Sequence, residues 1–163
     1  MMKILSRNAL IIFIVLIFIF CCQQKQQNIT ERDNEMIKNE VKNKFEKLIS
    51  ALNNLDSHEW SEIYSKDEFI SAFVSTDFYS SRKAFINAIT SYFTMREQQK
   101  VEPLEVEVTA LTPTLALLTS QEKTEMLLKN GENMRSKHVF TMIWKKEAED
   151  WKIIHSHESW NIE

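Results

Sequence analysis

The sequence predicts an α+β fold, with three helices followed by a cone-shaped, curved antiparallel sheet of four long strands plus a short one. Up to about residue 98, apolar side chains recur at helical spacing, whereas from residue 104 onward they alternate with polar ones. Helices and strands are therefore segregated along the chain, which favours α+β over a parallel βαβ arrangement. Because long strands twist strongly, the sheet should curve into a cone with an open mouth, wrapped by the helices.

The first 21 residues are predicted to be a signal peptide that precedes the domain. Lys3 and Arg7 form a short positive segment, and residues 9–20 are an uninterrupted apolar run of twelve. This run is short for a membrane span, which needs about 20 residues, but it fits the apolar part of a signal peptide. An uncleaved transmembrane anchor is the alternative.

Cys21 and Cys22 end this apolar run and are followed by a polar, amide-rich stretch. The arrangement resembles the signal of bacterial lipoproteins, in which a cysteine becomes the first mature residue and carries the lipid. Cys22 is the preferred attachment site, because Cys21 then supplies a small residue before the cut; Cys21 is the alternative. We expect an exported protein anchored to a bacterial membrane by this lipid, facing the periplasm or the surface. Residues 22–29 would be the lipidated, flexible tether, and residues 30–163 the domain.

The composition excludes several functional classes. Gly131 is the only glycine, so neither a P-loop nor a dinucleotide-binding glycine motif can be built. The 20 basic and 23 acidic residues give no basic field for nucleic acid. Cys21 and Cys22 are the only cysteines, so the domain lacks a thiol for a disulfide, a nucleophile or a zinc site. No cofactor is expected.

The first helix is expected over residues 30–53. Thr30 is a suitable N-cap, and Glu31 and Asp33 in the first turn favour a helix start. The apolar positions fall on one face, and they are Ile37, Val41, Phe45, Leu48, Ile49 and Leu52.

Two further helices and a short strand should follow before the sheet. A short helix begins after Asp56 or Ser57 and carries Trp60 and Tyr64 on one face. A short strand is expected over residues 68–75. The polar stretch at residues 77–82 is read as a loop in which Ser80 or Ser81 is the N-cap of a third helix over residues 82–98. The alternative is that this stretch lines the mouth of the pocket.

Four long strands complete the domain. They are expected around residues 104–110, over residues 114–129 and 135–146, and from Trp151 to Trp160. Asn130-Gly131 is the strongest hairpin signal in the chain. On the last strand, alternation places Trp151, Ile153, His155 and His157 on one face, which we expect to look into the cone.

These patterns resemble the nuclear transport factor 2-like superfamily, in its SnoaL-like and ketosteroid-isomerase-like branch. The specific part is the closing pattern Trp-Lys-Ile-Ile-His-Ser-His-Glu-Ser at residues 151–159, and the likeness extends over about residues 30–160. The resemblance implies a curved sheet wrapped by helices around a deep pocket, often in a dimer, for which Trp144 and Trp160 could supply an interface. Its members include isomerases, polyketide cyclases, dehydratases and non-catalytic association domains, so fold does not settle function.

The expected ligand pocket collects the aromatic and inward-facing residues of these elements. They are Trp60, Tyr64, His138, Phe140, Met142, Trp151, Ile153, His155 and His157. His155 and His157 could also place two imidazoles on one metal ion. However, a further ligand would have to be His138 or Glu158, and alternation directs Glu158 to the opposite face, so no metal is expected.

Catalytic chemistry is harder to place. An isomerase of the ketosteroid type needs a carboxylate base and oxyanion donors in an apolar pocket, but Met126, Met142 and Trp144 occupy inward positions where such acids would lie. We therefore expect a lipid-anchored domain for small-ligand binding or assembly, without catalysis. The alternative is a SnoaL-like enzyme that performs proton transfer, cyclisation or dehydration on a small apolar substrate, with His155 or His157 as base.

Overall fold

The computed structural model describes residues 29–162, so the expected signal peptide, Cys21, Cys22 and nearly all of the expected tether lie outside the described range. Within it the elements follow in the order α2 (Glu31–Asn53), α3 (Ser57–Glu62), β1 (Ser71–Val74), β2 (Asp77–Tyr79), α4 (Arg82–Met95), β3 (Arg96–Thr112), β4 (Leu115–Leu128), β5 (Asn133–Glu147) and β6 (Asp150–Ile162). None of the helices in this range combines the length and hydropathy needed to cross a bilayer.

The predicted α+β fold is confirmed, with two corrections to the sheet. All six strands form one sheet in the order β2-β1-β6-β5-β4-β3, and β1 pairs parallel to β6, whereas an antiparallel sheet was expected. The parallel edge forms because the chain after α3 runs alongside β6, where Ser65 N donates to Ile153 O at 2.9 Å and Ile70 N donates to Ile154 O at 2.7 Å. The second correction is β2, which occupies residues expected to form a loop and pairs with β1.

The helix starts follow the predicted caps. The Thr30 hydroxyl accepts a hydrogen bond from Asp33 N, the Asp56 carboxylate from Glu59 N and the Ser81 hydroxyl from Ala84 N. In contrast, α4 ends at Met95 and β3 already begins at Arg96. The sequence prediction missed this part of β3, because residues 96–103 do not alternate between apolar and polar side chains.

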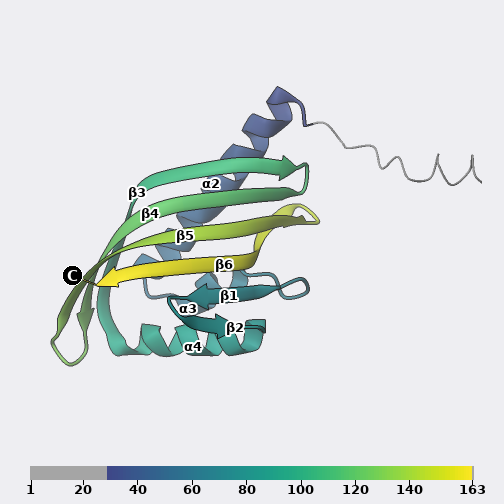
Figure 1. Ribbon diagram of the computed structural model, residues 1–163. Coiled ribbons are helices and arrows are strands. Elements are labelled where there is room, and N and C mark those ends of the chain that lie inside the picture. The colour runs from purple at the N-terminus through teal and green to yellow at the C-terminus, as the bar shows by residue number, and fades with distance from the viewer. Residues whose placement is uncertain (1–28, 163) are drawn as a thin grey trace, which may run out of the picture.

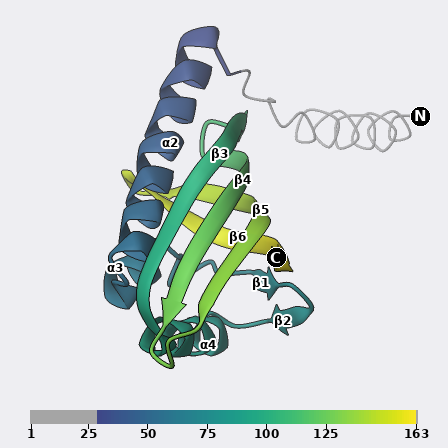
Figure 2. The same ribbon diagram turned by 90° about the vertical axis from the view of Figure 1, so that its left-hand side faces the viewer.

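The helices cover the concave side of the sheet (Figure 1). Figure 2 shows α2 running along the sheet beside β3, while α4 crosses its end next to the β4–β5 hairpin. The hairpin is tied to this helix, since Lys129 N donates to Met95 O at 3.0 Å. The space bounded by α2, α4 and the inner face of the sheet contains the hydrophobic core.

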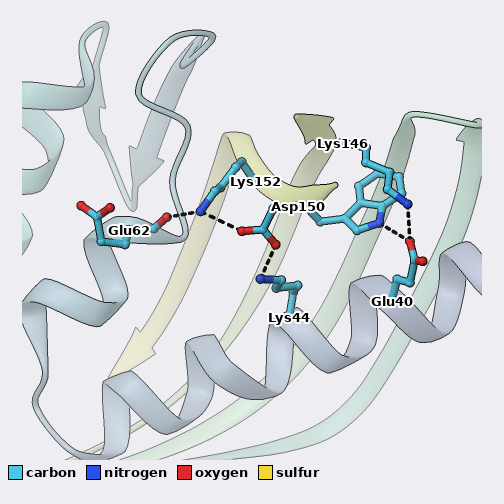
Figure 3. A network of polar contacts seen from close by, with 7 residues as sticks. Glu40, Lys44, Glu62, Lys146, Asp150 and Lys152 are labelled. Carbon is cyan, nitrogen blue, oxygen red and sulfur yellow. Dashed lines mark hydrogen bonds and ion pairs between the residues drawn. The ribbon is translucent and has the colours of Figure 1, made fainter. Parts of the chain in front are cut away.

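A polar network fixes α2 to the turn between β5 and β6 (Figure 3). Glu40 accepts hydrogen bonds from Trp151 Nε1 at 2.7 Å and from Lys146 Nζ at 2.9 Å. Lys44 of α2 forms an ion pair with Asp150, which also binds Lys152 at 3.1 Å. These contacts join α2 to the end of β5 and the start of β6.

Candidate functional site

A cavity of about 350 Å³ lies between the C-terminal half of α2, α4 and the concave face of the sheet. Most of its wall is apolar, with a small number of polar groups. The wall is formed by Leu48, Leu52, Trp60, Tyr64, Val74, Ser75, Ile89, Tyr92, Met95, Arg96, Gln99, Val101, Met126, Leu128, Met134, His138, Phe140, Glu158 and Trp160. A mostly apolar cleft with few polar groups is the usual form of a small-molecule site.

A β-bulge in β6 decides which side chains of the last strand reach this cavity. Trp144 of β5 pairs with Ile153, but the adjacent β5 residue pairs with His155, so Ile154 is an extra residue in β6. Such an insertion shifts the alternation of side chains by one position. Trp151 and Ile153 face inward before the bulge, and the even-numbered residues face inward after it.

The prediction that His155 and His157 look into the cone is therefore wrong. His155 is half-buried and His157 is exposed, and neither lines the cavity. His155 Nδ1 lies 3.0 Å from Ser71 Oγ, and the His157 ring lies 5.6 Å from that of Phe73. Both histidines thus contact β1 side chains, so they are not placed to act as a base on a ligand in the cavity.

The other predicted pocket residues separate into two groups. Trp60, Tyr64, His138 and Phe140 line the cavity. Met142, Trp151 and Ile153 are almost completely buried but belong to the core beyond the cavity wall.

Glu158, beyond the bulge, is a buried acid in the cavity wall. Its Oε2 accepts a hydrogen bond from Trp160 Nε1 at 3.1 Å. Burial raises the pKa of Glu158 to about 8, and the nearby charge of Glu122 acts in the same direction, whereas the Trp160 bond opposes the shift. The carboxyl group is therefore mostly protonated at neutral pH and can donate a hydrogen bond.

His138, on the neighbouring strand β5, lies beside Glu158 in the cavity wall. Its ring stacks on the Trp160 indole, with centroids 4.2 Å apart and planes inclined by 15°. Burial lowers the pKa of His138 to about 4, and the positive charge of Arg96 adds to this effect. The cavity wall therefore presents a neutral imidazole next to a neutral carboxyl group over most of the range between these two pKa values.

Glu122 lies behind His138, on the neighbouring strand β4. Its Oε2 is 3.6 Å from His138 Nε2, and its Oε1 accepts a hydrogen bond from the Ser120 hydroxyl. Burial raises the pKa of Glu122 to about 7. Within the described residues, Glu122 Oε2 and His138 Nδ1 have no hydrogen-bond partner, so this pair keeps unused capacity to bind or move a proton.

Tyr64 and Arg96 are further polar residues of the wall. Tyr64 is 1% exposed, and burial raises its pKa above the ordinary value. Arg96 Nη1 donates to Gln99 Oε1. No three His, Cys, Asp or Glu side chains between residues 29 and 162 are grouped closely enough to hold a metal ion.

The family model described as the SnoaL-like domain matches residues 41–163 of the sequence. The chain belongs to the SnoaL-like domain family. No protein in a search of curated proteins matches it.

Solved structures show the same fold at low sequence identity. A nuclear transport factor 2-like superfamily protein from Salmonella enterica superposes with a TM-score of 0.70 at 12% identity, over 77% of this chain and 91% of that one. A hexachlorocyclohexane dehydrochlorinase gives a TM-score of 0.68 at 10% identity, over 81% and 90% of the two chains. A candidate dehydratase from Streptomyces avermitilis gives 0.66 at 16% identity, over 74% and 94%.

Sequence reasoning missed Glu158, Trp160 and Arg96 as cavity residues. Strict alternation placed the first two on the opposite face of the strand, because the bulge was not recognised. The adjacent apolar pair Ile153-Ile154 was the available signal, since a break in the alternation of a strand is consistent with a bulge. Arg96 was assigned to the third helix, so nothing indicated that it would start a strand.

Proposed function

We propose that the domain binds a small, largely apolar molecule in the cavity between α2, α4 and the sheet. The observation that supports this proposal is the cavity itself, about 350 Å³ in volume with a predominantly apolar wall. Polar groups of the wall, among them Glu158, His138, Arg96 and Tyr64, would orient a ligand through hydrogen bonds.

A neutral fluorescent probe, N-phenyl-1-naphthylamine, tests this function. The wild-type domain should bind it with enhanced emission. Leu52→Trp, which fills part of the cavity wall, should weaken binding at least ten-fold. Met36→Trp is the matched control, because Met36 lies on the same helix but is 50% exposed and outside the cavity. Failure of the wild-type protein to bind the probe, or equal binding by Leu52→Trp, would reject the proposal.

A second candidate function is the SnoaL-like enzyme that the sequence left open. Its catalytic residues would be His138 and Glu158 in place of His155 or His157. The observation that favours it is the neutral imidazole of His138 beside the protonated carboxyl group of Glu158 in one apolar wall. In a dehydration, His138 would take a proton from carbon, the C=C bond would form as the C–O bond breaks, and Glu158 would protonate the departing hydroxyl group. Glu122 would stabilise the imidazolium. A dehydrochlorinase and a candidate dehydratase share the fold.

Turnover distinguishes this candidate from binding alone. A panel of small β-hydroxy carbonyl compounds would be followed by the absorbance of the unsaturated product. Glu158→Gln and His138→Asn should each abolish any turnover while still binding N-phenyl-1-naphthylamine. His157→Asn is the control, because His157 is exposed and outside the cavity wall. Turnover that survives in both cavity variants would exclude this mechanism.

The site of action is proposed to be a bacterial membrane surface, through a lipid on Cys22, in the periplasm or facing outward. The support is the apolar run of residues 9–20 that ends at Cys21-Cys22. Metabolic labelling with an alkyne fatty acid should modify the wild-type chain and not Cys22→Ser. Labelling of Cys22→Ser but not of Cys21→Ser would move the attachment to Cys21.

We propose that the domain forms a homodimer through apolar side chains at the β1–β2 edge of the sheet. The rings of Phe73 and Phe78 lie 4.8 Å apart there, and Phe78 is 58% exposed. The tryptophans that the sequence offered for an interface are not available, because Trp144 is fully buried and Trp160 lines the cavity. Light scattering should give a dimer that Phe78→Ser dissociates. A monomer at high concentration would exclude this assembly.

A further inference from the structure

Arg96 is the one lysine or arginine in the described cavity wall. It is the first residue of β3 and directly follows the last residue of α4. Its side chain is half-buried, and its guanidinium carbon lies 6.0 Å from the centre of the Tyr92 ring. A positive charge is thus built into a wall that is otherwise mostly apolar.

The guanidinium is positioned by a short relay to α2. Arg96 Nη1 donates to Gln99 Oε1, and Gln99 Nε2 donates to the backbone carbonyl of Leu52 at 3.0 Å. Gln99 is 9% exposed, so this relay is held inside the protein. It orients Arg96 through a neutral amide, which leaves the guanidinium charge unneutralised, and no other side-chain hydrogen bond of Arg96 is formed within residues 29–162.

Within residues 29–162 no carboxylate forms an ion pair with Arg96. Glu158 and Tyr92 are the groups whose negative charge would act on it, and burial raises the pKa of Glu158 to about 8, so this carboxyl group carries little charge at neutral pH. Burial also lowers the pKa of Arg96, although a guanidinium stays charged in proteins. Burying a cation without a counter-charge costs free energy, and a bound anion would offset this cost.

We propose that the cavity selects ligands that carry one anionic group, such as a carboxylate, which pairs with Arg96 while the apolar remainder fills the cavity. The guanidinium fork matches a carboxylate in shape and charge. The protonated carboxyl group of Glu158 can donate a further hydrogen bond to the same anion. This inference rests on the proposed function and names the chemical class of its ligand: small monoanionic amphipathic molecules.

Two probes of nearly equal shape isolate the contribution of the charge. Isothermal titration at pH 7 would compare 2-naphthoate with the neutral 2-naphthamide. The wild-type domain should bind naphthoate at least ten-fold more tightly. Arg96→Gln should lose this preference because its affinity for naphthoate falls while its affinity for naphthamide stays the same. Arg96→Lys should retain part of the preference. Arg135→Gln removes an equal charge from the nearby hairpin, where the side chain is 74% exposed, and should change neither affinity.

The outcomes separate the inference from the function on which it rests. Equal affinity of the wild-type protein for both probes, no binding of naphthoate, or an unchanged preference in Arg96→Gln would overturn the role of Arg96. Binding of N-phenyl-1-naphthylamine decides independently whether the cavity accepts apolar molecules. If Arg96→Gln does not fold, Arg96→Lys replaces it, and a preference undiminished in Arg96→Lys would also overturn the role of the guanidinium fork.

Discussion

The imidazole of His138 lies parallel to the indole of Trp160, with ring centroids 4.2 Å apart, and the same indole donates its N–H to Glu158 at 3.1 Å. Trp160 therefore contacts two titratable groups of the cavity wall, His138 and Glu158. One of its faces shields the imidazole from water, and its edge stabilises the ionised form of the carboxyl group.

Replacing Trp160 with Phe should raise the pKa of Glu158 above its value of about 8. Phenylalanine keeps an aromatic ring against His138 but removes the N–H donor that favours the carboxylate. A carboxyl-carbon NMR titration of the wild-type protein and the variant measures the shift. An unchanged or lower pKa would show that the hydrogen bond does not govern this group.

Glu122 and Glu158 should each make the domain less stable as pH rises from about 5 to 7, whereas His138, with its lowered pKa, acts in the opposite direction and offsets part of the loss. The pKa values of Glu122 and Glu158 are raised by burial to about 7 and about 8, so the unfolded chain releases these protons at lower pH than the folded one. Each group then lowers the free energy of unfolding by up to about 1.4 kcal/mol per pH unit in this interval.

Denaturation of Glu122→Gln and Glu158→Gln at several pH values checks this dependence. Each variant should show a flatter decline than the wild-type protein. Glu125→Gln is the charge-matched control, since the Glu125 side chain is 57% exposed. Identical slopes for the wild-type protein and both buried-site variants would contradict the assigned shifts.

Glu40→Ala should lower the free energy of unfolding by about 1–2 kcal/mol. The substitution removes the acceptor of the Trp151 indole N–H and of Lys146, and it leaves the 2% exposed Trp151 without this partner. Glu46→Ala, at an exposed position of the same helix, serves as the control in urea denaturation. Equal stability of the two variants would show that the network in Figure 3 contributes nothing measurable.

Gly131→Ala should destabilise the β4–β5 hairpin by about 1 kcal/mol. Gly131 has a φ of +87°, whereas an added Cβ would meet no atom within 4 Å, so backbone conformation alone causes the loss. Gly131→Asn should be milder, because asparagine tolerates a positive φ better. A lower melting temperature for Gly131→Asn than for Gly131→Ala in thermal unfolding would contradict this explanation.

The fold was predictable because its signals are local. Thr30, Asp56 and Ser81 cap the helices as expected, and Asn130-Gly131 forms the predicted hairpin turn. Strand β2 was not predicted, because three exposed or half-buried residues carry no alternation signal and depend on pairing with β1. The parallel pairing of β1 with β6 joins segments more than 80 residues apart, which no local pattern specifies.

The cavity was predictable only in part. Trp60, Tyr64, His138 and Phe140 lie on elements with regular periodicity, and all four line it. One extra residue in β6 reversed the expected orientation of everything that follows, so His155 and His157 exchanged places with Ser156 and Glu158. A bulge is a tertiary adjustment, and its position can be read only once the pairing partner of each residue is known.

Helix α2 also determines how far the cavity lies from the start of the domain. Its 23 residues span about 35 Å at the usual rise of an α-helix, and Leu48 and Leu52, which line the cavity, lie near its far end. If the chain is held to a bilayer through Cys22, the helix acts as a rigid spacer.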